Sequence, residues 1–178
     1  MTLRAQELFF EAFESLPRQG PGNLDSTRRA FSLCRELPSS PQVLDLGCGV
    51  GAQTLHLASL LDGPILAIDS HPPLVERLRA TVEERGLLGR VEARVGDMSR
   101  LDLPPESFDL VWSEGALYNL GLETALPMCA GLLRPGGYLA FTEPVWRAPD
   151  APTEVREAFA DYPTMGGIDD VLSLIEVS

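Results

Sequence analysis

The stretch "VLDLGCGVGAQTLHLA", residues 43–58, decides the fold. Four residues that are apolar or acidic lead into three glycines, Gly47, Gly49 and Gly51, and a helical pattern follows at once. Glycine this dense marks a backbone that turns tightly or lets a ligand come close. The order strand, glycine turn, helix predicts the opening of a βαβ unit with a nucleotide-like cofactor at the turn. The alternative is a tight turn that serves structure alone.

Strands and helices alternate on both sides of this turn. Strands are expected over residues 42–46, 64–69, 90–95, 108–113 and 137–143. Helices are expected over residues 3–16, from Asp25 or Ser26 to about Leu37, and over residues 52–61, 72–86 and 123–133. Because parallel crossovers take a dozen residues or more, this alternation predicts a doubly wound α/β fold with a mostly parallel sheet. We expect an N-terminal helical cap over residues 1–40 and one α/β domain over residues 41–178.

Composition narrows the class of protein. The chain has 178 residues, of which 44% are hydrophobic and 22% charged, enough for one domain with a substantial core. Its net charge of −12 argues against nucleic-acid binding, and its 14 basic residues are all arginine. No apolar run approaches the ~20 residues that cross a membrane. The N-terminal apolar stretch carries acids, unlike a signal peptide, so we expect a cytoplasmic protein. Three scattered cysteines and two histidines lack metal-ligand spacing, so no metal is expected.

Two acids follow the next strands of the predicted sheet. Asp69 ends the second strand, where a carboxylate can accept both hydroxyl hydrogens of a ribose. Its alternative role is to cap the helix that starts near residue 72. Asp97 follows the third strand between Gly96 and Met98, where it can bracket an adenine through the exocyclic amine. Its alternative role is that of an ordinary turn residue.

Asp45 bears on which cofactor the turn binds. It stands two residues before Gly47, where its charge opposes the pyrophosphate of a dinucleotide. S-adenosylmethionine instead offers an ammonium, which Asp45 can help to hold directly or through water, and a carboxylate for the helix N-terminus. The balance favours S-adenosylmethionine. NAD stays open, because Ala52 completes a G-x-G-x-x-A pattern that NAD proteins also use.

The sequence resembles the class I S-adenosylmethionine-dependent methyltransferases from residue 43 to residue 143. "VLDLGCGVG" resembles their first motif, "AID" the second and "GDM" the adenine-contacting segment. "FDLVWSEGALYNLG" and "LLRPGGYLAFTE" are similar to their fourth-strand and fifth-strand segments. The segments "FFEAFESLPRQGPG" and "WSEGALYN" resemble a bacterial small-molecule branch that is similar to quinone-biosynthesis methyltransferases.

The resemblance implies a set of cofactor-binding residues. They are Asp45, Gly47, Cys48, Gly49 and Gly51 at the glycine loop, Asp69 at the ribose, Ser70 and His71 near the ribose and adenine, Gly96, Asp97 and Met98 at the adenine, and Ser113 near the methionine part. It also implies that the segment from Arg18 to Gly22 can fold over the cofactor.

The expected reaction is methyl transfer to a small-molecule acceptor. A sulfonium is already a good leaving group, so the protein mainly aligns the reactants and excludes water. Glu114 and Tyr118 are the candidate catalytic residues, with Asn119 and His71 also near the predicted mouth. The alternatives are a solvated acid for Glu114, a pocket-wall aromatic for Tyr118, and a helix-entry or adenine-stacking residue for His71.

One departure from the family pattern concerns the C-terminal part. The family usually has a sixth strand and an antiparallel seventh, whereas residues 151–163 and 168–178 indicate two helices here. We therefore expect strands six and seven to be missing and the edge at the fifth strand to be open, which suits a homodimer. Two other functions remain: an NAD(P)-binding Rossmann oxidoreductase, and a regulatory module that binds the cofactor without turnover.

Overall fold

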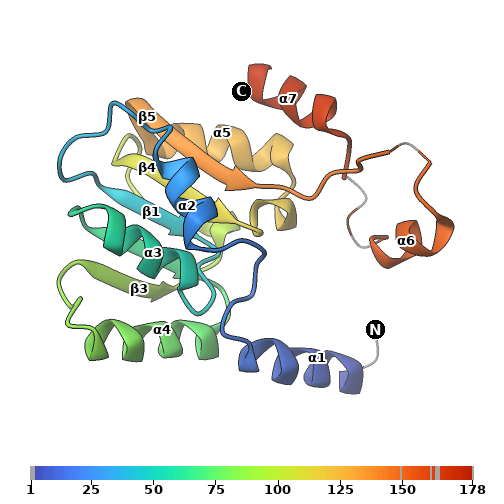
Figure 1. Ribbon diagram of the computed structural model, residues 1–178, viewed down its shortest axis with the longest axis horizontal. Coiled ribbons are helices and arrows are strands. Elements are labelled where there is room, and N and C mark those ends of the chain that lie inside the picture. Colours follow the sequence, from blue (N-terminus) through green and yellow to red (C-terminus); the bar gives the residue numbers. More distant parts are fainter. Residues whose placement is uncertain (1–2, 149, 161, 163–164, 178) are drawn as a thin grey trace.

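The computed structural model describes residues 3–148, 150–160, 162 and 165–177. A five-stranded sheet runs through its centre in the order β3-β2-β1-β4-β5, and each neighbouring pair is parallel (Figure 1). The strands are β1 (Val43–Leu46), β2 (Ile65–Asp69), β3 (Val91–Val95), β4 (Phe108–Glu114) and β5 (Leu133–Thr142). The predicted doubly wound parallel sheet is confirmed.

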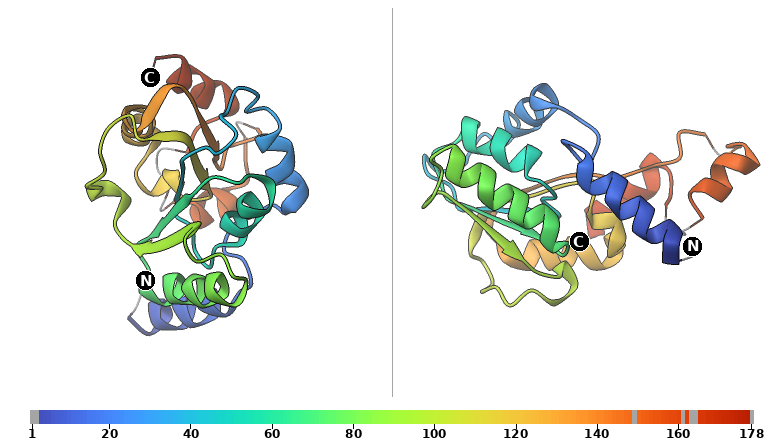
Figure 2. Two further views of the ribbon diagram at one scale, coloured as in Figure 1. Left: turned by 90° about the vertical axis from the view of Figure 1, so that its left-hand side faces the viewer. Right: turned by 90° about the horizontal axis from the view of Figure 1, so that it is seen from below.

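Helices cover both faces of this sheet. They are α1 (Leu3–Ser15), α2 (Leu24–Phe31), α3 (Ala52–Leu60), α4 (Pro72–Glu84), α5 (Leu122–Leu132), α6 (Thr153–Ala158) and α7 (Ile168–Val177), with short 3-10 turns η1 (Met98–Arg100) and η2 (Leu117–Asn119). Helices α2, α3 and α4 lie on one face and α5 on the other, as the right-hand view of Figure 2 shows. Helix α7 packs on α5, whereas α6 lies away from the sheet (Figure 1).

Neighbouring residues of β1 belong to two separate apolar layers, one on each face of the sheet. Val43 packs with Leu57 of α3 and Leu78 of α4, while Leu44 packs with Ala125 of α5 on the opposite face. All these side chains are buried. A strand with apolar neighbours on both faces is apolar at nearly every position, which explains the continuous pattern in the sequence.

Most element boundaries lie within two residues of those predicted, whereas α2, β5 and α6 differ by more. Helix α2 starts at Leu24, because its N-cap is Asn23 and not the expected Asp25 or Ser26. The Asn23 side chain accepts from Ser26 N at 3.0 Å, and Ser26 Oγ accepts from Asn23 N at 2.8 Å. The helix ends at Phe31 rather than near Leu37. Strand β5 begins four residues before the predicted start at residue 137, and its register against β4 shifts between Phe108 and Leu110.

After β5, the described residues form the two helices α6 and α7, loops that connect them, and one isolated bridge between Trp146 and Gly167. Helices α6 and α7 fall within the two predicted helical segments, whose residues 161, 163 and 178 lie outside the described part, as do residues 1–2 of the predicted cap. Strand β5 is accordingly the last strand at its side of the sheet. Among the described helices, none combines the length and the apolar character that crossing a membrane requires.

Candidate functional site

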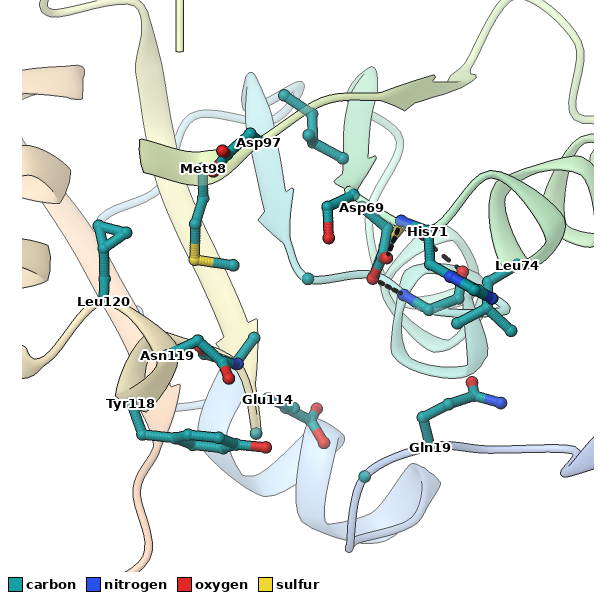
Figure 3. Close-up of a pocket in the computed structure, with 18 of the residues that line it drawn as sticks. Gln19, Asp69, His71, Leu74, Asp97, Met98, Glu114, Tyr118, Asn119 and Leu120 are labelled. Carbon is teal, nitrogen blue, oxygen red and sulfur yellow. Dashed lines mark hydrogen bonds between the residues drawn. The ribbon is translucent and has the colours of Figure 1, made fainter. Parts of the chain in front are cut away.

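A cavity of about 540 Å³ opens at the carboxyl edge of the sheet. Most of the residues predicted for the site line it: Gly47, Cys48, Gly49, Asp69, Ser70, His71, Gly96, Asp97, Met98, Glu114 and Tyr118, together with Asn119. Figure 3 shows Asp69, Asp97 and Met98 along one side of the open space and Tyr118 and Glu114 along the other. The topology explains this assembly, because parallel strands bring their carboxyl ends to one edge.

Two glycines of the turn lie on the cavity wall in a conformation that other residues rarely adopt. Gly47 has a φ of +74° and Gly49 a φ of +54°. A Cβ atom at Gly47 would lie 2.2 Å from Cβ of Ala116, and one at Gly49 would lie 2.7 Å from Oε1 of Gln19. The turn is therefore closed tightly by the chain itself at these two positions. Cys48 between them is buried, and burial raises the pKa of its thiol.

The third glycine lies off the cavity wall and serves packing. Gly51 is the N-cap of α3 with a φ of +81°, and a Cβ there would lie 2.1 Å from Cδ1 of Leu78. The absence of a side chain lets α4 approach the start of α3. Gly51 does not line the cavity, and its contact with the cofactor stays a prediction.

Asp69 sits on the wall at the end of β2 and ties the turn to the next helix. Its Oδ2 accepts from the backbone N–H of Gly49 at 2.8 Å, and its Oδ1 accepts from that of His71 at 2.9 Å. A carboxylate has about four acceptor positions, so roughly two remain for ligand hydroxyl groups. The two roles weighed for Asp69, ribose acid and helix cap, are therefore compatible.

His71 joins helix α1 to this wall. It is the N-cap residue of α4, its ring stacks on Phe10 with centroids 4.9 Å apart, and its Nε2 lies 2.7 Å from Oε1 of Glu14. Phe10 and Phe13 of α1 also line the cavity. Ser70 beside His71 is an exposed part of the wall. The ring of His71 is thus held by protein partners on the cavity's α1 side.

Asp97 and Met98 form the part of the wall beyond β3. Oδ1 of Asp97 accepts from the backbone N–H of Ser99 at 2.8 Å and from its hydroxyl at 2.7 Å. These bonds lower the pKa of Asp97, so the carboxylate is ionised at neutral pH. Met98 is half-buried and Gly96 packs on Ile68. An acceptor oxygen thus lies next to an apolar surface at this end of the cavity.

Asp45 and Ser113 lie behind the wall rather than on it. Oδ2 of Asp45 accepts from the Thr54 hydroxyl at 2.5 Å, and burial raises the pKa of this carboxyl to about 7. Its Oδ1 is buried with no partner among the described residues. Asp45 was predicted to hold an ammonium either directly or through water. Because Asp45 does not line the cavity, only the contact through water fits its position. Ser113 donates to Leu46 O at 2.8 Å and so connects β4 to β1.

Glu114 lies on the wall with both carboxylate oxygens engaged. Oε1 accepts from Thr27 Oγ1 at 3.1 Å and from Trp112 Nε1 at 2.9 Å, and Oε2 accepts from the guanidinium of Arg18. A general base needs a free lone pair facing the substrate. Three donors leave about one acceptor position free, so protein partners hold most of this carboxylate, and the catalytic role of Glu114 stays a prediction.

Tyr118 and Tyr162 face each other at the remaining side of the cavity. Their rings meet edge to face with centroids 4.9 Å apart, and burial, followed by the charge of Tyr162, raises the pKa of Tyr118. Tyr162 was missing from the sequence-based site, as were Phe10, Phe13 and Gln19 as individual residues. Only long-range packing brings these side chains to the cavity, and no local motif marks them. Within the described residues, no group of three side chains is arranged to hold a metal ion.

Comparisons with known proteins identify the family. The model of a methyltransferase domain matches residues 43–137, more than half of the chain. An O-methyltransferase (cnsE) of Penicillium expansum is 31% identical over 136 residues, which cover 75% of this chain and 49% of that protein. Aklanonic acid methyltransferase DauC of Streptomyces sp. is 37% identical over 110 residues, covering 60% of this chain and 50% of its own. The chain thus spans about half the length of these curated relatives.

A solved structure agrees on the fold. An S-adenosylmethionine-dependent methyltransferase from Geobacter sulfurreducens, in complex with S-adenosyl-L-homocysteine, superposes with a TM-score of 0.78 at 22% identity. The match covers 94% of this chain and 68% of that one. The glycine turn, the acids after β2 and β3 and the matched residues lead to one conclusion: the chain belongs to the methyltransferase domain family and has the class I S-adenosylmethionine-dependent methyltransferase fold.

Proposed function

We propose that the protein binds S-adenosylmethionine at the carboxyl edge of the sheet and transfers its methyl group to a small-molecule acceptor. One observation carries the proposal: a single cavity joins the glycine turn at Gly47 and Gly49 to the carboxylates of Asp69 and Asp97. The names of the relatives support it, since they describe an O-methyltransferase and a methyltransferase of aklanonic acid, and the Geobacter protein was solved with S-adenosyl-L-homocysteine.

The residues of this cavity fit the parts of S-adenosylmethionine. Asp69 has acceptor capacity for ribose hydroxyls, and Asp97 beside Met98 offers an acceptor and an apolar surface to an adenine. The buried Oδ1 of Asp45 has no partner among the described residues, so it is free to accept a hydrogen bond from a water that links it to the ammonium of the ligand. A volume of about 540 Å³ is within the usual range for cofactor and small-molecule sites.

The bound cofactor would supply a methyl group on a sulfonium, which already leaves readily. What remains for the chain is to orient the acceptor and keep water away. Tyr118, Asn119 and Tyr162 line the side opposite Asp69 and Asp97, and their hydroxyl and amide groups are suited to hold a polar acceptor. We place the acceptor on this side.

Thermal unfolding with S-adenosylhomocysteine tests the binding. A ligand at about 100 times its Kd stabilises the folded state by about 2.7 kcal/mol, which raises the Tm of a chain of this size by about 5–10 °C. Asp69→Ala should abolish most of this rise, whereas Asp62→Ala, in an exposed loop, should keep it. NADH should give no rise. Absence of any shift with saturating S-adenosylhomocysteine in the wild type would refute the proposal, and a shift with NADH alone would favour the oxidoreductase.

Transfer itself needs a separate assay. We expect the protein to produce S-adenosylhomocysteine in the presence of some member of a panel of small phenols, amines and carboxylic acids. Cofactor binding without turnover on any of them would favour the regulatory module. A cytoplasmic location, as expected from the sequence, and a homodimer through the β5 edge are part of the same proposal. The position of β5 at one side of the sheet supports the homodimer.

A further inference from the structure

We infer that the ion pair of Arg18 with Glu114 is a latch that holds the segment Arg18–Gly22, here called the strap, across the cofactor cavity. The strap connects α1 to α2, and its Gln19 and Gly20 line the cavity. The inference rests on the proposed function, since it concerns how the same cavity retains its cofactor. It makes Glu114 a positioning residue.

The latch is buried and connects parts of the chain that are far apart. Arg18 is 15% exposed and Glu114 is 6% exposed, and the two residues are separated by 96 positions. The guanidinium also donates from Nε to Gly20 O at 3.0 Å and from Nη2 to Pro21 O at 3.1 Å. One side chain thus folds the strap onto itself and fastens it to the end of β4.

The other oxygen of Glu114 is fixed as well, which makes the anchor rigid. Oε1 receives the Thr27 hydroxyl of α2 and the Trp112 indole N–H of β4. With Arg18 on Oε2, three donors from three segments converge on one carboxylate. Charged hydrogen bonds in such a buried position are stronger than exposed ones, and removal of one partner leaves the other charge uncompensated.

Gln19 connects the strap to the glycine turn through hydrogen bonds. Its Oε1 accepts from Val50 N at 3.1 Å, and its Nε2 donates to Phe13 O at 3.1 Å and to Leu16 O at 3.3 Å. Gly49 has room for this amide only because it lacks a side chain. In Figure 3, Gln19 and Glu114 lie at the same side of the open space, opposite Asp97. A strap released from Glu114 would free both the turn and the cavity's cover.

Release of the strap should weaken cofactor binding. The variants are Arg18→Met, Glu114→Gln and the pair of both. We expect each single variant to raise the Kd for S-adenosylhomocysteine about tenfold in calorimetric titration. The double variant should bind no more weakly than the weaker single one, because both changes break the same contact. Hydrogen exchange of the strap amides should be faster in all three variants, with and without ligand.

A matched control is the exposed ion pair of Arg28 with Asp25 on α2, whose side chains are 53% and 85% exposed. Arg28→Met should leave both the Kd and the strap's exchange at wild-type values. Should a single latch variant fail to fold, the double variant, which buries no charge, carries the test. Wild-type Kd and unchanged strap exchange in the latch variants would overturn the inference.

Kinetics separate the latch from a catalytic base. Loss of a base lowers kcat by about 100-fold or more at saturating cofactor. For Glu114→Gln we expect the KM for S-adenosylmethionine to rise by a larger factor than kcat falls, and the opposite split would overturn the positioning role. If the wild type does not bind S-adenosylhomocysteine at all, the proposed function fails, and strap exchange in the ligand-free protein still decides whether the latch exists.

Discussion

The two sides of the cavity are built in different ways. The strand-end side consists of the glycine turn, Asp69 and Asp97, which stand at the ends of β1, β2 and β3 and are held by nearby backbone N–H groups. The cover side consists of the strap, which precedes β1, of Tyr118 in η2 between β4 and β5, and of Tyr162 after β5. These parts meet through long-range contacts. The strand-end side has its geometry from the fold, whereas the cover side depends on side chains that reach across it.

This difference predicts that the largest effect on cofactor affinity comes from the strand-end side. Asp69→Ala removes the proposed acceptor of the ligand's hydroxyls and the bonds to the backbone N–H groups of Gly49 and His71. Hydrogen bonds to a charged group are worth about 1.5–3 kcal/mol each, so the Kd for S-adenosylhomocysteine should rise by about 100-fold or more. Calorimetric titration measures it, with Asp62→Ala as the control. A rise below about fivefold would place the affinity on the cover side instead.

Within the glycine turn, Gly47 and Gly49 line the cavity, whereas Gly51 packs against Leu78. Gly51→Ala should lower the free energy of unfolding by about 2–4 kcal/mol, because its Cβ would overlap Leu78 and its φ is positive. Gly86→Ala is the matched control, since φ is +66° there and no atom lies within 4 Å; about 1 kcal/mol is expected. Urea unfolding compares the two, and equal losses would contradict the packing role of Gly51.

The buried acid behind the turn predicts a pH effect on stability. The pKa of Asp45 is about 7 in the folded protein against 3.8 as the ordinary value, so the folded state holds more protons between these pH values. Its contribution to stability therefore falls as the pH rises from about 4 to about 7, by an amount on the order of a few kcal/mol. Asp45→Asn keeps an acceptor for the Thr54 hydroxyl and should remove this slope.

The measurement is the Tm of both proteins from pH 5 to pH 8. Burial also raises the pKa of Glu143 to about 7, which gives a slope of the same sign in both proteins, so the difference between the two curves isolates Asp45. We expect the wild type to lose stability relative to Asp45→Asn as the pH rises. Parallel curves would mean that Asp45 is not held in a raised-pKa environment.

The smallest effect on cofactor affinity is expected from a single hydroxyl on the cover side. Tyr118→Phe should change the Kd for S-adenosylhomocysteine by less than about twofold, since Tyr118 lies opposite the strand-end acids (Figure 3). One lost hydrogen bond of about 0.5–1.5 kcal/mol should raise the KM of a polar acceptor by about 2- to 10-fold. A larger effect on the cofactor than on the acceptor would reverse the assignment of the two sides.

The same difference explains what could be predicted from the sequence. The alternation of strands and helices, the turn and the places of Asp69 and Asp97 follow from local patterns, because a parallel βαβ alternation brings those strand ends to one edge. The N-cap Asn23 was missed because Asp25 and Ser26 offered competing cap residues close by. Gly51 belongs to the same glycine motif as Gly49, and only three-dimensional packing against Leu78 tells them apart.

The cover side could not be predicted residue by residue. The position of Glu114 at the end of β4 predicts an acid at the mouth of the cavity. Nothing near it in the sequence indicates Arg18 or Thr27 as its partners. Tyr162 lies within the helix predicted over residues 151–163, but α6 ends at Ala158, so the predicted helix does not place this side chain. Side chains that meet through tertiary packing carry no local signature, so their roles emerge only from the structure.

The central claim is that Asp69 binds the sugar of a nucleoside cofactor at the glycine turn. A crystal structure of the full chain with S-adenosylhomocysteine tests it most directly. We expect the ribose hydroxyls within hydrogen-bond distance of the Asp69 carboxylate, and the adenine beside Asp97 and Met98. Ligand density elsewhere on the molecule, or a ribose that leaves Asp69 without contact, would contradict it.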